Sequence, residues 1–230
     1  MSGSEVPVAV VFDLDGVIRD WNEAEMADVE VAYGLEPGTI LAVAFEPELG
    51  AAAMTGRLAY RGWMDTIRAR VLDAHGPSVA GALDEWEANV GLVDVPMLEV
   101  LRAVRRHATV ALLSNGTTRL RRDLDVLDLT DEFDVIFNTA ELGVAKPDPD
   151  VFRHVLDQLE VRPEQALFID DLLPNVEGAR SVGIDAHQHV ARASTIEFLV
   201  DRGVPVRLDG TATVSADDDV PRPPRIRRAP

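Results

Sequence analysis

The sequence contains no cysteine, and this absence excludes several kinds of chemistry. A chain without thiols has no disulfide bond, no thiolate metal site and no cysteine nucleophile. No apolar run approaches the roughly 18 residues that a membrane-spanning helix requires, so no membrane partner is expected. The apolar stretch at 6–12 runs directly into two aspartates, without the basic region and cleavage site of a signal peptide. Together these absences favour a cytoplasmic protein.

Positive charge is scarce as well. Lys and Arg total 22 against 40 Asp and Glu, which leaves a formal net charge of −18. A surface this acidic repels nucleic acid, so we expect no nucleic-acid partner. Lys146 is the only lysine in the chain. It is either a chance survivor among arginines or a position that needs a compact ammonium on a flexible stem in place of a planar guanidinium.

Strand-like and helix-like segments alternate over much of the sequence. Continuous apolar and β-branched runs are typical of strands buried on both faces, and they occur at Val8–Val11, Thr109–Leu113, Val135–Phe137, Ala166–Ile169 and, more weakly, Asp185–His189. Helix-period segments lie between them at Pro96–His107, Thr118–Leu127, Asp148–Leu159 and Pro174–Val182. This alternation predicts an α/β fold with a Rossmann-like, doubly wound parallel sheet.

One long segment after the first strand interrupts the alternation. Residues 20–93 contain helical patterns and no convincing strand, and the expected helices are Glu23–Tyr33, Pro47–Leu58, Arg61–His75 and Ala80–Val90. The segment is far longer than a crossover needs, which indicates an inserted α-helical cap over the carboxyl edge of the sheet. We therefore expect a catalytic core of residues 1–19 and 94–208, a cap of residues 20–93, and a disordered tail of residues 209–230, which is acidic and then rich in proline and arginine.

Two polar patches follow the first two core strands. Asp13 and Asp15 lie two residues apart at a strand end, where one carboxylate can stay ionised as nucleophile and metal ligand while the other transfers protons. Ser114, Asn115 and Gly116 offer neutral hydrogen-bond donors to phosphate oxygens, next to the start of a helix. Taken alone, the first patch could be an ordinary acidic turn and the second an ordinary helix cap.

Two further patches follow later in the chain. Lys146 precedes a helix, where its charge would offset clustered carboxylates and a phosphoryl group, although a surface lysine is the alternative. Asp170 and Asp171 end an apolar strand, a costly arrangement unless a cation lies there, although both could be helix-capping acids. Mg²⁺ prefers one or two carboxylates together with water and substrate phosphate. Because the carboxyl ends of parallel strands form the binding edge, the four patches together predict one phosphate and Mg²⁺ site.

The series Asp13-x-Asp15-Gly16, Ser114-Asn115-Gly116, Lys146-Pro147 and Asp170-Asp171 resembles the haloacid dehalogenase superfamily of hydrolases, over about residues 8–203. The helical insertion is similar to the cap of its phosphatase, mutase and dehalogenase branches. The resemblance implies that Asp13 is the nucleophile and a metal ligand, and that Asp15 donates and accepts protons while its backbone carbonyl binds the metal. It implies that Ser114, with Asn115 and Gly116, binds the phosphate and that Lys146 balances the negative charge. It also implies that Asp171 binds the metal directly, that Asp170 lies beside it in the inner or outer shell, and that Asn175 orients the loop.

The resemblance leaves the exact reaction open. We expect a phosphatase acting on a small phosphorylated metabolite, because Asp15 supplies the acid that dehalogenase members lack. A β-phosphoglucomutase-like sugar phosphomutase would use the same residues, and a 2-haloacid dehalogenase is disfavoured by Asp15. A phosphoryl-accepting receiver-like switch is a non-enzyme alternative, disfavoured by the long insertion and by the place of Lys146 before Asp170. No protein partner is implied.

Several other residues carry weaker expectations. Arg19 is expected to be exposed, and His187 and His189 are expected on the exposed face of a strand. Trp63, Trp86 and Met54 are interpreted mainly as cap core. Possible substrate contacts from the cap are Arg57, Arg61 and Trp63.

Overall fold

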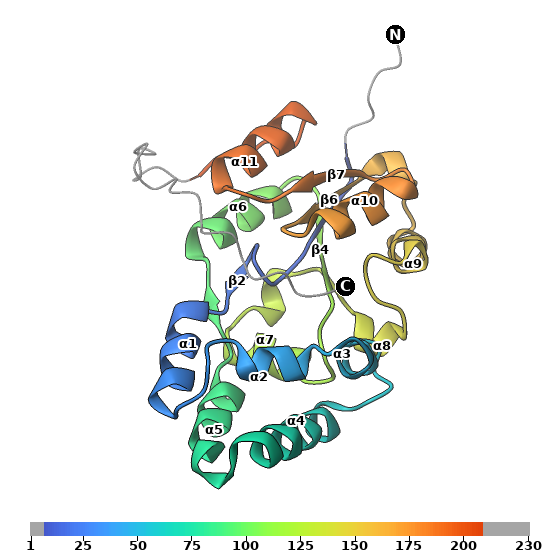
Figure 1. The fold of residues 1–230 in the computed structure, drawn as a ribbon. Helices are drawn as coiled ribbons and strands as arrows, with labels where there is room; N and C mark the ends of the chain where they lie inside the picture. Colours follow the sequence, from blue (N-terminus) through green and yellow to red (C-terminus); the bar gives the residue numbers. More distant parts are fainter. Residues whose placement is uncertain (1–6, 209–230) are drawn as a thin grey trace.

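The structure, a computed structural model, describes residues 7–208 and centres on a five-stranded parallel sheet (Figure 1). The strand order is β5-β4-β1-β6-β7. The strands are β1 (Ala9–Phe12), β4 (Thr109–Ser114), β5 (Val135–Asn138), β6 (Ala166–Asp170) and β7 (Asp185–Gln188). The central strand β1 pairs Phe12 with Leu112 of β4 on one side and with Ile169 of β6 on the other. The predicted doubly wound α/β class is confirmed.

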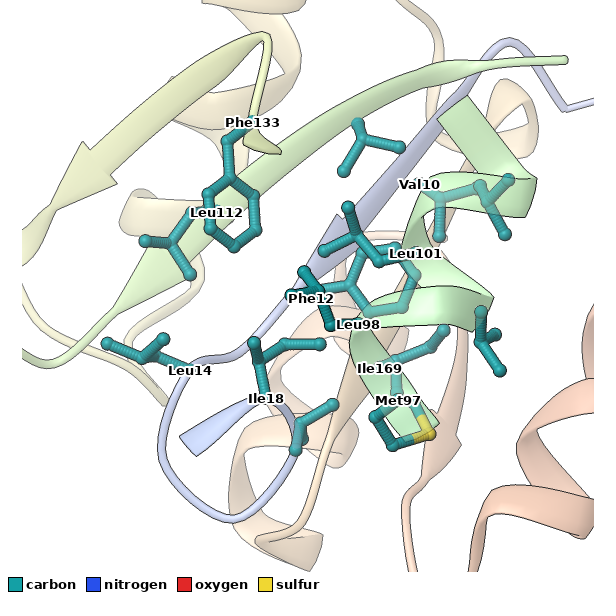
Figure 2. Packing of buried hydrophobic residues seen from close by; sticks show 14 of the residues in the cluster. Val10, Phe12, Leu14, Ile18, Met97, Leu98, Leu101, Leu112, Phe133 and Ile169 are labelled. Carbon is teal, nitrogen blue, oxygen red and sulfur yellow. The ribbon is translucent and has the colours of Figure 1, made fainter. Parts of the chain in front are cut away.

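Successive residues of each strand point to opposite faces of the sheet, and both faces are buried. Val10 and Phe12 of β1 belong to one buried cluster, whereas Val11 between them belongs to another. Figure 2 shows Phe12 and Ile169 packed against Leu101 and its neighbours on α6 (Val95–Arg105). Burial on both faces explains why β1, β4 and β6 read as continuous apolar runs, whereas the edge strand β7 is polar at three of its four positions and only partly buried.

Helices cover the two faces separately. The first cluster contains side chains of α6, α7 (Leu120–Val126) and α11 (Arg192–Asp201), and the second contains side chains of α9 (Pro149–Leu159) and α10 (Leu173–Ser181). Short elements complete the core, namely α8 (Thr139–Leu142) and the 3₁₀ turns Thr130–Glu132 and Pro163–Gln165. Two of these helices, α6 and α9, have aspartate N-caps. The side chains of Asp94 and Asp148 accept hydrogen bonds from first-turn N–H groups at 3.0 and 2.9 Å.

A helical unit is inserted between two short strands. Its helices are α1 (Glu23–Ala32), α2 (Thr39–Ala44), α3 (Pro47–Met54), α4 (Tyr60–His75) and α5 (Ala80–Ala88), with a 3₁₀ turn at Pro77–Val79. They enclose a hydrophobic cluster of their own around Trp63 and Ile67. In Figure 1 these helices lie together at one end of the molecule. An inserted helical cap was predicted, and we propose that it comprises residues 20–93.

The structure corrects several sequence-based predictions within and beyond this unit. The segment predicted to lack strands, residues 20–93, contains β3 (Leu92–Val93) and the second residue of β2 (Arg19–Asp20). These two strands pair antiparallel and join the cap to the core. Three helices, α2, α8 and α11, were not predicted. Helix α3 ends at Met54, not Leu58, because Gly56 takes a positive φ of 68° and passes so close to α8 that a Cβ would lie 2.0 Å from the Ala140 carbonyl oxygen.

Two other expectations concern the ends of the chain and the membrane. The predicted disordered tail, residues 209–230, lies outside the described residues. Within residues 7–208, no helix has both the length and the apolar character needed to cross a membrane.

Candidate active site

The polar patches predicted from the sequence meet at one edge of the sheet. Asp13 directly follows β1, while Ser114 and Asp170 are the last residues of the neighbouring strands β4 and β6. Because the three strands are parallel and adjacent, their carboxyl ends bring these side chains to the same edge.

Asp13 lies at the centre of this edge. Its side chain is buried, and its backbone N–H donates to the Ile169 carbonyl at 2.8 Å, which holds the first residue after β1 against β6. Burial raises the pKa of the Asp13 carboxyl well above its ordinary value, and Asp170 raises it further, while Lys146 opposes both. Such a carboxylate is ionised more readily once further positive charge is present.

Lys146 supplies the buried positive charge of the site. Its Nζ lies 2.7 Å from Asp13 Oδ1 and 2.6 Å from Asp170 Oδ2. Burial lowers the pKa of this ammonium, but the two carboxylates outweigh that effect and hold the pKa above its ordinary value. The side-chain amide of Asn115 accepts from the Lys146 N–H and donates to its carbonyl, both at 2.9 Å. The loop after β4 therefore positions the only lysine of the chain.

Asp170 and Asp171 occupy different environments. Asp170 is fully buried, and its oxygens accept hydrogen bonds from Lys146 Nζ, the Leu172 N–H and Asn175 Nδ2 at 2.6 to 3.0 Å. Asp171 is only half-buried. Asn175, which was predicted to orient this loop, donates from Nδ2 to both oxygens of Asp170 at 3.0 Å. Asp170 is thus held by the protein, and Asp171 is the more accessible of the two carboxylates.

Three carboxylates form a group suited to a cation. Oxygen atoms of Asp13, Asp170 and Asp171 lie within 4.8 Å of one another. Hard divalent cations prefer oxygen ligands of this kind, and Lys146 Nζ is paired with two of the three carboxylates, those of Asp13 and Asp170. No group that includes His187 or His189 forms such a cluster among residues 7–208.

The phosphate-binding patch after β4 has one unusual feature. The Ser114 hydroxyl is buried, and it has no hydrogen-bond partner among the described residues. A buried hydroxyl without a partner is costly, so a ligand oxygen at this edge would satisfy it. Asn115 and Gly116 lie beside it and line the neighbouring cavity. The Asn115 side chain, in contrast, is already bonded to the Lys146 backbone.

Asp15 lies in a tight loop between β1 and β2. Gly16 allows the turn with a φ of 87°, and its N–H donates to the Arg19 carbonyl at 2.7 Å. One carboxylate oxygen of Asp15 accepts hydrogen bonds from Arg19 Nε at 2.7 Å and Trp21 Nε1 at 2.8 Å. The prediction that Arg19 is exposed is wrong, since this residue is only 3% exposed. The reason is that β2 returns it to the site beside Asp15.

A cavity of about 190 Å³ lies between the cap and this edge of the core. Asp15, Asn115 and Gly116 border it from the core, and Trp63, Trp86 and Met54 are among its cap residues. The two tryptophans also belong to the packed cap cluster, so they serve both as core and as wall. Arg57 and Arg61, suggested as substrate contacts, are exposed and do not line this cavity.

Sequence reasoning missed an arginine that ties the cap to the core. Arg119, just before α7, donates to Asp123 at 2.6 Å, to the Glu87 carbonyl at 2.7 Å and to the Tyr60 hydroxyl. The spacing of four residues between Arg119 and Asp123 was the only signal, and it is also common on exposed helices.

His187 and His189 are less exposed than the sequence predicts. His189 is buried, and its Nδ1 lies 2.8 Å from the Thr195 hydroxyl, whereas His187 is half-buried and stacks on Phe198. Helix α11, which was not predicted, covers this end of β7 and removes the expected exposure.

Comparison with known proteins identifies the family to which this chain belongs. A family model for haloacid dehalogenase-like hydrolases matches residues 8–183, and the chain therefore belongs to this family of hydrolases. A phosphatase of Mycobacterium tuberculosis (strain CDC 1551) is 31% identical over 196 residues, which cover 78% of this chain and 85% of that protein. The phosphorylated carbohydrates phosphatase of Thermotoga maritima is 30% identical over 188 residues, or 77% of this chain and 82% of that protein.

Other similarities are partial or concern the fold alone. The match to rat bifunctional epoxide hydrolase 2 is 28% identical over 98 residues and spans only 18% of that protein. A HAD family enzyme of Bacteroides thetaiotaomicron, in complex with magnesium and inorganic phosphate, has a TM-score of 0.64 at 19% identity and covers 79% of this chain and 93% of that one. The L-2-haloacid dehalogenase of Xanthobacter autotrophicus has a TM-score of 0.62 at 24% identity, with 86% and 83% covered.

Proposed function

We propose that the chain is a Mg²⁺-dependent phosphatase that hydrolyses a small phosphate monoester through a phospho-aspartate on Asp13. The observation that carries the proposal is the placement of the buried Asp13 carboxylate, 2.7 Å from Lys146 Nζ and grouped with Asp170 and Asp171. The phosphatases named among the relatives of this chain support the same reaction class.

The metal would be held by Asp13 and Asp171, with the Asp15 carbonyl and the buried Asp170 beside them. When bound, Mg²⁺ supplies positive charge that lets an anionic carboxylate approach an anionic phosphate. Ser114, with Asn115 and Gly116, would bind phosphoryl oxygens, and Lys146 would hold Asp13 in position and balance its charge.

The first half of the reaction transfers the phosphoryl group to the protein. An oxygen of Asp13 attacks phosphorus and forms a new O–P bond, while the bond between phosphorus and the ester oxygen breaks. Asp15 donates a proton to the departing oxygen, which leaves as an alcohol.

The second half regenerates the enzyme. Asp15 takes a proton from a water molecule, whose oxygen attacks phosphorus and displaces the Asp13 carboxylate. Inorganic phosphate leaves, and Asp15 is protonated for the next cycle. Asp15 also favours this reaction over 2-haloacid dehalogenation, which needs no proton donor at that position.

The test follows the covalent intermediate. Phosphate release from p-nitrophenyl phosphate and acetyl phosphate is measured with Mg²⁺ and with EDTA, for the wild type, Asp13→Asn and Asp15→Asn. We expect metal-dependent release that is lost in Asp13→Asn. With acetyl phosphate, whose leaving group needs little acid assistance, Asp15→Asn should accumulate a phosphorylated protein, detected by mass spectrometry.

Asp13→Asn is the matched control for that adduct, because it keeps the shape of the side chain and removes the attacking oxygen anion. Phosphate release that survives in Asp13→Asn would refute the proposed nucleophile. An adduct located on another residue would refute it as well.

A further inference from the structure

The cavity beside the proposed catalytic residues has a charge balance that disfavours a second anionic group on the substrate, besides its phosphate. Its charged wall residues are four carboxylates and two guanidiniums, contributed by Asp15, Glu23, Glu30, Asp123, Arg19 and Arg119. The described residues that line it include no other cation. The formal charge of the whole chain, −18, has the same sign.

Both arginines of the wall are already engaged within the protein. Arg119 binds Asp123 at 2.6 Å and the carbonyls of Glu87 and Asn89 at 2.7 and 3.1 Å. It also donates to the Tyr60 hydroxyl. A second anionic group on a substrate would have to replace these bonds to bind Arg119.

Arg19 is held equally firmly. Its guanidinium binds Asp15 at 2.7 Å, lies 3.8 Å from Asp123 and stacks 4.2 Å from the centre of the Trp21 ring. Its side chain is almost completely buried. Recruiting Arg19 for a substrate would break its hydrogen bond to the Asp15 carboxylate, so this cation is poorly placed to recognise a second anion.

Apart from Asn89, Asn115 and Thr117, the rest of the wall is apolar and rich in aromatic rings. Phe45, Tyr60, Trp63 and Trp86 line the cavity, and Trp63 lies within 5.9 Å, ring centre to ring centre, of each of the other three. Rings arranged in this way bind flat apolar groups well. The volume of about 190 Å³ exceeds the roughly 150 Å³ at which an apolar protein cavity binds benzene. One ring with short substituents therefore fits.

We infer that the substrate is the phosphate monoester of an uncharged, apolar alcohol about the size of one substituted ring. This inference rests on the proposed phosphatase function and adds the chemical class of the leaving group. It disfavours bisphosphorylated sugars and esters that carry a carboxylate, because the cavity has no unengaged cation among its described residues to pair with a second anion.

The test compares esters whose leaving groups are all primary alcohols, so that intrinsic reactivity stays similar. The specificity constant kcat/KM is measured with Mg²⁺ for benzyl phosphate, 4-carboxybenzyl phosphate and glycerol 3-phosphate. We expect benzyl phosphate to exceed 4-carboxybenzyl phosphate by about tenfold or more, because burial of an unpaired carboxylate is costly. It should exceed glycerol 3-phosphate by about tenfold or more, because a buried ring contributes apolar binding.

A matched pair of variants tests the charge argument directly. Met26 lines the cavity from α1, so Met26→Arg adds a cation to the cavity wall, and Met26→Gln adds a polar group of similar length without charge. The ratio of kcat/KM for 4-carboxybenzyl phosphate to that for benzyl phosphate should rise about tenfold in Met26→Arg and stay near the wild-type ratio in Met26→Gln. Using a ratio within each variant cancels a general loss of activity.

Acetyl phosphate separates the two possible failures, because its small leaving group makes little use of the cavity. If the wild type hydrolyses acetyl phosphate but prefers 4-carboxybenzyl phosphate or glycerol 3-phosphate to benzyl phosphate, the inferred substrate class is wrong and the phosphatase function stands. If acetyl phosphate and all the esters fail as substrates, the proposed function itself is wrong.

Discussion

The core and the cap of this protein bury their residues in opposite ways. The core places charge in its interior, where Lys146 lies between Asp13 and Asp170 at the end of a parallel sheet. The cap interior is mainly apolar and aromatic around Trp63, and its buried carboxylate, Glu30, accepts hydrogen bonds from the backbone N–H groups of Gly38 and Ile40. The ion pairs of the cap, such as that between Arg70 and Glu46, are largely exposed. The core therefore supplies the charged groups that a reaction needs, and the cap supplies an apolar surface. The cavity lies between them.

The largest effect is expected where the core holds its buried charge. Lys146→Met leaves two buried carboxylates without their cation, so the free energy of unfolding in EDTA should fall by about 3–5 kcal/mol, and phosphatase activity should be lost. Urea denaturation measures the first quantity and phosphate release the second. The control is Arg70→Met, which removes an exposed pair of the cap and should change the unfolding free energy by about 1 kcal/mol or less. Equal losses in both variants would contradict the contrast.

The second effect concerns the centre of the cap. Trp63→Ala opens a hole in the aromatic cluster, and such truncations lower stability by about 3–5 kcal/mol. If the cap is a unit with its own core, amide hydrogen exchange should accelerate in α2, α4 and α5 and change little in β1, β4 and β6. Uniform acceleration over the whole chain would show that cap and core unfold together.

A smaller effect is expected from pH, and it belongs to the core alone. In metal-free protein the folded-state pKa of Asp13 lies above its ordinary value of 3.8. The stability contributed by the protonated carboxyl is therefore complete below pH 3.8 and is lost as the pH rises through the raised pKa. Stabilisation by Mg²⁺ should grow over the same range, because the cation binds the ionised carboxylate.

Thermal unfolding with EDTA and with Mg²⁺, at a series of pH values, measures this dependence. Asp13→Asn is the control, since the difference between wild type and variant isolates the single carboxyl from the other acids. An identical pH dependence in both proteins would rule out Asp13 as its source.

The smallest effect is expected at the junction of the two regions. Arg119 reaches from the core to the cap carbonyls of Glu87 and Asn89, and Tyr60 meets it from α4. Tyr60→Phe removes one hydrogen bond and should lower the free energy of unfolding by about 0.5–1.5 kcal/mol. Arg119→Met also leaves the buried Asp123 without its main partner and should have the larger effect, about 1–3 kcal/mol. A smaller effect for Arg119→Met than for Tyr60→Phe would contradict the assigned contacts.

Features of this protein that depend on local pattern could be predicted from the amino-acid sequence. Continuous apolar runs predicted the parallel strands, because a strand buried on both faces needs apolar residues at every position. Residues at strand ends share one edge in any parallel sheet, so Asp13, Ser114 and Asp170 were expected together from their positions in the chain. The single lysine could be picked out by counting, because every other basic residue that contributes to the total of 22 Lys and Arg is an arginine.

Features that depend on how the elements pack against one another could not be predicted from the sequence. Arg19 was expected in solvent, but the pairing of β2 with β3 turns it inward onto Asp15. The burial of His189 depends on α11, and the link from Arg119 to the cap depends on how the inserted helices are placed over the core. The hydrogen bonds between the Asn115 side chain and the backbone of Lys146, 31 residues later, were also not predicted from the sequence. For Arg19, Arg119 and Asn115 a deciding partner lies at least 31 residues away in the chain, and local periodicity carries no information about it.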